Sequence, residues 1–207
     1  MPTSAAPADA GVLWLAALQR ALGRAAHDVK DALNGVSVNL EVVRSRAGRA
    51  DAPASAVAPF AEAAAQQLER LTALLDAVLA LGRSDRAPAD VGVTLRRIAA
   101  LCSASNSSAD ARVTVRDEVV GDARTSVAGD AVRLALAAPL LDAVVARKGE
   151  VRDAVVCELA GDGDSLAVRL LADRPITMPA DAADVLRAAG IRWTESANEL
   201  SVVFPRA

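Results

Sequence analysis

His27, the only histidine of the 207-residue chain, stands among residues that suit chemistry at phosphorus. Its imidazole ionises near neutral pH and can attack phosphorus when one ring nitrogen keeps its lone pair. The neighbouring Asp28 can accept the proton of the other ring nitrogen. Arg24 and Lys30, about one helical turn before and after, can screen an incoming phosphoryl group. His27 is therefore a candidate phosphoacceptor, and the simpler alternative is a solvated histidine on a charged surface.

A long helix must position these side chains, because apolar residues recur at steps of three and four through this region. The stripe consists of Leu15, Leu18, Leu22, Val29, Leu33, Val36, Leu40 and Val43. It predicts one helix from near Gly11 to near Arg46. At 100° per residue, His27 lies off this stripe, on a polar face. Its neighbours on and beside that face are Arg20, Gly23, Arg24, Lys30, Asp31 and Asn34.

A second helix should follow after a connection at residues 47–55, where Gly48, Asp51 and Pro53 break the pattern. The same three-four spacing predicts this helix from about Ala54 to Leu81, closed by Gly82. Two helices cannot hide apolar stripes of this length by themselves. We therefore expect a helical hairpin that dimerises as a four-helix bundle.

The second half of the chain mixes helical and strand periods and predicts an α+β layer, with strands backed by helices on one face. Expected helices cover 93–103, 130–147 and 179–189, and expected strands cover 112–119, 154–160, 166–172, 191–194 and 200–204. Pro139 should bend or break the helix that contains it. We divide the chain into a loose N-terminus (1–10), a hairpin domain (11–85) and a second domain (90–207), joined by a linker with Pro88.

Composition limits the remaining classes. A net charge of −3 with 53% hydrophobic and 2% aromatic residues excludes disorder, a basic nucleic-acid binder and a disulfide-stapled miniprotein. The longest apolar run, Leu134 to Leu141, is far shorter than a membrane span, and no leader pattern opens the chain, so we expect a cytoplasmic protein without membrane contact. Cys102 and Cys157 lack metal-ligand spacing and should be small buried hydrophobes; we expect no metal site.

The segment from Ala26 to Val36, AHDVKDALNGV, resembles the phosphoacceptor box of sensor histidine kinases. In that box the histidine is followed by an acid, an apolar residue, a base, a polar residue, a small residue or proline, and leucine. The resemblance extends over residues 11–81, and it implies that His27 carries phosphate and that Asp28 orients and deprotonates it. Asp31 stands where the family commonly has Thr or Asn to position water. A carboxylate there repels a phosphoryl group, so phosphatase activity is not expected.

The second half departs further from that family. Asp142 stands where the resemblance would place the magnesium-binding Asn, and Asp173 lies in a remnant of the adenine-contacting loop, ADRPI. No glycine cluster follows, and only one short helix fits between Ile176 and Gly190, where the family has a mobile lid. Without backbone amides to hold the phosphates, ATP should bind weakly or not at all. Asp142 and Asp173 are vestigial positions, and no cofactor is expected.

An intact box joined to a degenerate histidine-kinase-ATPase-like α/β sandwich is similar to the degenerate-kinase histidine phosphotransferases of bacterial phosphorelays. The resemblance implies a homodimer in which His27 exchanges phosphate with the aspartates of response-regulator receiver domains. The receiver would supply Mg²⁺. We expect the receiver to contact residues on the polar face of the first helix, namely Gly23, Arg24, Lys30, Asp31 and Asn34.

Two alternatives stay open. A non-catalytic pseudokinase would bind and regulate a receiver or a kinase, and an unreactive His27 would favour it. A divergent ATP-dependent kinase would show appreciable affinity for Mg-ATP. No nucleic-acid partner is expected, because the net charge is negative and the basic residues of the first helix alternate with acids.

Overall fold

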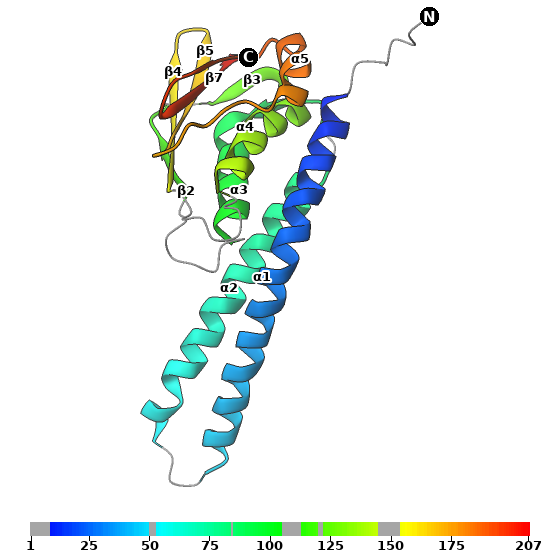
Figure 1. Ribbon diagram of the computed structural model, residues 1–207. Helices are drawn as coiled ribbons and strands as arrows, with labels where there is room; N and C mark the ends of the chain where they lie inside the picture. Colours follow the sequence, from blue (N-terminus) through cyan, green and yellow to red (C-terminus); the bar gives the residue numbers. More distant parts are fainter. Residues whose placement is uncertain (1–8, 50–52, 84, 105–112, 120–121, 145–153) are drawn as a thin grey trace, which may run out of the picture.

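The computed structural model describes residues 9–49, 53–83, 85–104, 113–119, 122–144 and 154–207, without the side chains of 23–25, 27–28 and 103–104. Its most extended part is a helical hairpin of α1 (Ala10–Ala47) and α2 (Ala58–Leu81), which projects from the rest of the molecule as a long arm (Figure 1). A short 3-10 turn, η1 (Ala54–Ala56), leads into α2. The predicted hairpin is confirmed.

Both helices of the hairpin have defined ends. Asp9 caps α1, where its carboxylate accepts a hydrogen bond from the Gly11 amide at 2.9 Å. Gly82 closes α2, and its amide donates to the carbonyl of Val78 at 2.8 Å. Between the helices, a Cβ added at Gly35 would lie 2.6 Å from Nε2 of Gln67, so the glycine permits a close approach.

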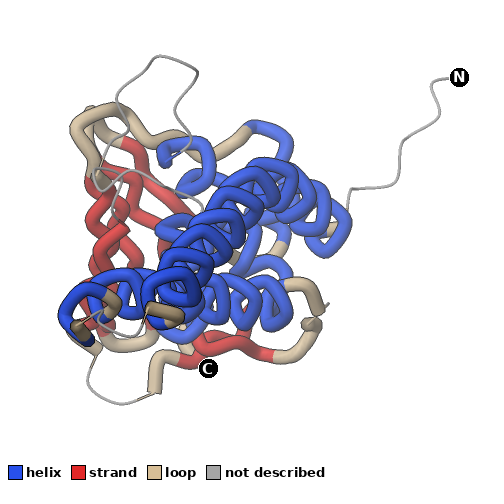
Figure 2. Tube along the Cα trace, turned by 90° about the horizontal axis from the view of Figure 1, so that it is seen from below, coloured by secondary structure: helices blue, strands red, loops and turns tan. Residues whose placement is uncertain are grey.

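A five-stranded mixed sheet forms the other end of the molecule, with strand order β2-β4-β5-β7-β6. Only the β2–β4 pair is parallel. Helices lie on one side of this sheet (Figure 2), where α3 packs against β2 and α4 against β4, which confirms the α+β class. The strands are β2 (Val113–Asp117), β4 (Val155–Asp162), β5 (Ser165–Leu171), β6 (Arg192–Glu195) and β7 (Glu199–Pro205), and the helices are α3 (Val91–Ala104), α4 (Gly129–Val144) and α5 (Ala180–Ala188).

Glycines stand at two turns of the α+β part, as the sequence pattern predicts. The β4–β5 turn contains Gly163 at φ 53°, and Gly190, two residues after the end of α5, has φ 81°. Both values lie in the left-handed region that glycine adopts without strain. A small second sheet was not predicted: β1 (Pro88–Asp90) pairs antiparallel with β3 (Arg124–Ala128). Three residues are too few for β1 to show any periodicity.

The expectation that Pro139 breaks its helix was wrong. Helix α4 runs unbroken from Gly129 to Val144 with Pro139 inside it. All of its residues except Asp142 and Ala143 are buried, because the helix packs against α1, α3 and α5 as well as the sheets. Tertiary packing on every side offsets the hydrogen bond that proline removes.

One apolar core joins the hairpin to the α+β part. It includes Trp14 of α1, Leu81 of α2, Leu140 of α4 and Phe204 of β7, all at most 1% exposed. Cys102 and Cys157 are buried in it as predicted, and burial raises the pKa of each thiol to about 12. Among the described residues, no helix combines the length and the apolar composition that crossing a bilayer requires.

Candidate functional site

The candidate phosphoacceptor position lies near the middle of α1, and the described residues around it define an open face. At 100° per residue, Arg20, Asp31 and Asn34 fall within about 40° of position 27. All three are exposed, and so are Lys30 and the adjacent Ala26. We call this surface the α1 face. It is accessible to a second protein, which phosphate transfer to or from a partner requires.

Several predicted site residues have backbones in α1 but side chains outside the described set: His27, Asp28, Gly23 and Arg24. Helix geometry brings their positions together with those of Lys30, Asp31 and Asn34 on or beside one face. Asp142 and Asp173 lie elsewhere, on α4 and in the β5–α5 connection, and both are exposed. The hydrogen-bond geometry between His27 and Asp28 stays a prediction.

The α+β part contacts the first half of α1 and leaves the α1 face uncovered. Its α4 and α5 pack against the end of α1 that carries Leu13, Ala17 and Ala21 (Figure 1). The α1 face begins at Arg20, and position 27 lies seven residues further along, about 10 Å along the helix axis. The α+β part is thus beside the face rather than over it.

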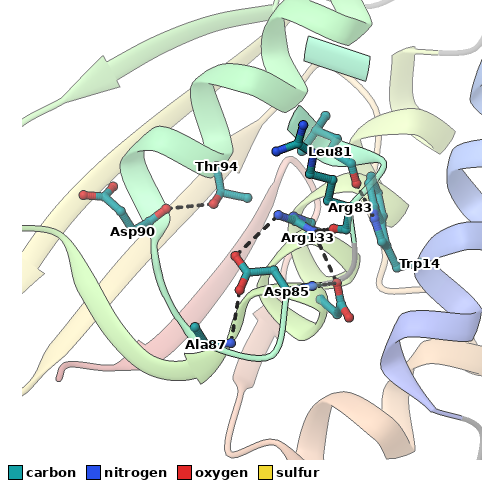
Figure 3. Close-up of polar contacts among 9 residues, drawn as sticks. Trp14, Leu81, Arg83, Asp85, Ala87, Asp90, Thr94 and Arg133 are labelled. Atoms are coloured by element: carbon teal, nitrogen blue, oxygen red, sulfur yellow. Dashed lines mark hydrogen bonds and ion pairs between the residues drawn. The ribbon is translucent and has the colours of Figure 1, made fainter. Parts of the chain in front are cut away.

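A polar clamp fixes the linker between the hairpin and the α+β part (Figure 3). Arg133 of α4 is its centre, with a side chain only 8% exposed. Its guanidinium donates a hydrogen bond to the carbonyl of Arg83 and lies 3.5 Å from Asp85 and 3.3 Å from Asp130. The Asp85 amide donates in turn to Oδ1 of Asp130 at 3.0 Å. We call these four residues the linker clamp.

The backbone strengthens the linker clamp. The amide of Asp130 donates to the carbonyl of Asp85 at 2.9 Å, and that of Gly129 donates to Ala87 at 3.0 Å. A Cβ at Gly129 would lie 2.9 Å from the Asp85 side chain, so the two segments are in close contact. Residues 83, 85 and 87 are therefore held against α4, which disfavours swinging of the α+β part relative to the hairpin.

The segment between the β5 strand and Gly190 is short. Only α5 lies between Ile176 and Gly190, as predicted, so this segment has no room for a long lid. A cavity of about 270 Å³ lies between α1, α4 and α5, and its charged lining residues are Arg20, Asp142 and Asp181. Two carboxylates at this cavity oppose the binding of phosphates. No group of three or more potential metal ligands occurs among the described side chains.

Sequence reasoning missed the linker clamp and the cavity. Asp85 and Asp130 are 45 residues apart, and neither belongs to a local motif. Arg20 was predicted on the polar face of the first helix and Asp142 as a vestigial position. Nothing in the sequence indicated that they line one cavity with Asp181. The one sequence feature that pointed toward the linker clamp is Asp130 at the start of a strongly apolar helix. A carboxylate in that position becomes buried and needs polar partners.

Comparison with known proteins gives similarity in structure only. No family model and no curated protein matches the chain. A bacterial phosphotransferase of known structure is 13% identical over 98% of both chains, with a TM-score of 0.40. Two further solved structures that the chain is similar to are histidine kinases. The Acinetobacter baumannii histidine kinase AdeS is 8% identical, covering 86% of this chain and 97% of its own, with a TM-score of 0.40.

Another similar structure is the histidine kinase ThkA in complex with the response regulator protein TrrA. It is 11% identical, covering 93% of this chain and 63% of its own, with a TM-score of 0.44. At such identities and TM-scores these relationships carry no mechanistic weight.

Proposed function

We propose that this chain is a histidine phosphotransferase of a two-component phosphorelay. The imidazole of His27 attacks the phosphorus of a receiver's aspartyl phosphate, a P–N bond forms, and the P–O bond to the aspartate breaks. Asp28 accepts the proton of the other ring nitrogen, and the receiver's own Mg²⁺ neutralises the phosphoryl oxygens. The reverse reaction passes phosphate to a second receiver. The observation that carries the proposal is the exposed α1 face around position 27.

The same face suits a receiver as partner. Lys30 and Asn34 are exposed beside position 27 and can donate hydrogen bonds to the docked domain or its phosphoryl group. Gly23 and Arg24, about one turn before position 27, complete the proposed contact surface. Gly23 leaves room for close approach, and Arg24 adds a second positive charge.

We also infer that the hairpin dimerises as a four-helix bundle. Large apolar side chains on both helices stay 50–66% exposed in the single chain. They are Leu33 and Leu40 of α1, and Leu68, Leu75 and Leu79 of α2. On α1 these leucines lie about 120° away from position 27. A second copy covering them would bury five leucines per chain and leave the α1 face free.

Two features argue against an ATP-dependent kinase. The linker clamp holds the α+β part in one orientation, whereas direct transfer from a bound nucleotide would require that part to reach position 27. The cavity between α1, α4 and α5 also carries Asp142 and Asp181, whose charges repel a triphosphate. Phosphate is therefore expected to come from a partner.

One observation supports a non-catalytic pseudokinase as the second candidate. Asp31 is exposed on the α1 face, about 40° from position 27. Its carboxylate repels an approaching phosphoryl group. If this repulsion dominates, the chain would bind receivers through the α1 face without accepting phosphate from them.

A transfer assay separates these functions. The full chain is incubated with a panel of phosphorylated receiver domains, with Mg-ATP alone in a parallel reaction and the His27→Ala variant as control. Acid-labile phosphate that comes from a receiver, depends on His27 and is absent with ATP alone supports a phosphotransferase. Labelling by ATP alone would establish a kinase. Receiver binding without labelling from any donor would establish the pseudokinase.

A further inference from the structure

The cavity between α1, α4 and α5 has the composition of a small-molecule site. Most of its lining residues are apolar, among them Leu13 from α1 and Leu134 and Leu141 from α4, while polar atoms contribute the larger share of the surface that faces it. Its volume of about 270 Å³ admits a compound of amino-acid size. Ligand pockets in proteins typically combine apolar walls with a few polar groups that orient the ligand.

The three charged side chains of this cavity make no hydrogen bond or ion pair with the part of the chain that the structure describes. Arg20 comes from α1, Asp142 from α4 and Asp181 from the first turn of α5. Opposite charges that line one cavity without pairing leave space between them. A ligand that bears both a cation and an anion can bridge that space.

We propose that this cavity binds a small zwitterion with an apolar side chain, of the size and chemistry of an aliphatic α-amino acid. The ammonium group interacts with Asp142 and Asp181, the carboxylate interacts with Arg20, and the side chain lies against Leu134 and Leu141. Charge complementarity at both ends selects for the zwitterion over compounds that carry only one of the two charges.

The charge of the cavity also determines what it rejects. Two carboxylates against one guanidinium give a net negative site, so a nucleoside triphosphate is disfavoured. Arg20 belongs to the α1 face as well, about 10 Å along the helix from position 27. A ligand on Arg20 would therefore lie at the edge of the proposed receiver surface. Binding itself does not depend on phosphotransfer and is tested separately from it.

The test uses L-leucine as the probe and calorimetric titration of the full chain, with 4-methylpentanoate and isoamylamine as analogues that keep only the carboxylate or only the amine. We expect leucine to bind with a millimolar dissociation constant and each analogue at least tenfold more weakly, since each loses charge-assisted hydrogen bonds. Arg20→Gln and the double variant Asp142→Asn, Asp181→Asn should each weaken leucine binding about tenfold.

Matched controls come from exposed residues outside the cavity. Arg97→Gln on α3 and Asp164→Asn in the β4–β5 turn should bind leucine as the unchanged chain does. Thermal unfolding of every variant shows whether a loss of affinity reflects a loss of fold. The proposal would be overturned if leucine showed no binding at a concentration about ten times the expected dissociation constant. It would also be overturned if the two analogues bound as tightly as leucine, or if Mg-ATP bound more tightly than leucine.

Discussion

The indole nitrogen of Trp14 donates a hydrogen bond to the carbonyl of Leu81 at 3.0 Å, across 67 residues of sequence. Both residues are only 1% exposed. The bond joins the second turn of α1 to the last residue of α2, directly before the linker. It therefore fixes the end of the hairpin to which the α+β part is attached.

Replacing Trp14 with Phe should reduce stability markedly. The Trp14→Phe variant retains most of the apolar contact but deprives a buried carbonyl of its donor, which costs about 1–3 kcal/mol. Urea unfolding measures the change. Trp193→Phe is the matched control, because Trp193 is only half-buried, lies beside Arg187, and its indole donates no hydrogen bond to any residue that the structure describes. Equal losses in the two variants would contradict the role assigned to the Trp14 bond.

Breaking the linker clamp should cost more than breaking a surface ion pair. Arg133→Leu removes the guanidinium that contacts Arg83, Asp85 and Asp130, and we expect a loss of about 3 kcal/mol. Arg96→Leu is the control, since its 2.6 Å pair with Asp117 is 52% and 31% exposed and contributes about 0–1 kcal/mol. Trypsin should also cleave after Arg83 faster in the Arg133 variant. Unchanged cleavage would show that the clamp does not hold the linker.

Removing the imidazole should abolish phosphate uptake and leave assembly intact. Position 27 lies off the apolar stripe of α1, so His27→Ala has no packing reason to weaken the hairpin. Phosphorylated receivers provide the activity readout, and sedimentation provides the mass in solution. Dissociation of the dimer in this variant would mean that position 27 belongs to the interface.

A charge on the proposed dimer face should separate the copies without unfolding them. Leu33 is 50% exposed in the single chain, so Leu33→Asp is tolerated by the monomer, but the charge would be buried in a dimer. Light scattering should show a monomer with native circular dichroism. Gln66→Asp, on an exposed part of α2 about 160° from Leu68, should remain dimeric. A dimeric Leu33 variant would refute the proposed interface.

The two buried thiols predict a specific pH response. Burial is the main cause that raises the pKa of Cys102 and Cys157 from 9.0 to about 12, so both stay protonated at pH 8 in the folded chain. Iodoacetamide at pH 8 should modify neither thiol until urea unfolds the protein. Each thiol has a higher pKa in the folded chain than in the unfolded chain, so the folded state binds the thiol proton more tightly. The stability that this difference contributes is complete below pH 9 and is lost as the pH rises toward 12. Rapid native alkylation would contradict the burial.

Elements with a strong local period were accessible from the sequence. The three-four stripe of α1 and the turn glycines of the β4–β5 hairpin report local geometry, and both predictions agree with the structure. The position of His27 off the stripe followed from the same period. How its side chain meets Asp28 stays a prediction, because it depends on rotamers that periodicity does not determine.

Features that depend on tertiary context were not accessible. Helix α4 has almost no amphipathic pattern because it is buried on all sides, so its tolerance of Pro139 could not be read locally. The short β1 strand exists only because β3 pairs with it. The linker clamp and the cavity join charges from separate elements, and no spacing rule connects Arg133 with Asp85 or Arg20 with Asp181.

The burial of α4 has a thermodynamic consequence for the whole chain. This helix is the common neighbour of α1 in the hairpin and of β4 in the large sheet. Neither half can expose its apolar surface without also exposing α4, so the loss of one half removes the packing partner of the other. Calorimetry should therefore show a single heat-absorption peak, with the hairpin and the sheet melting as one cooperative unit.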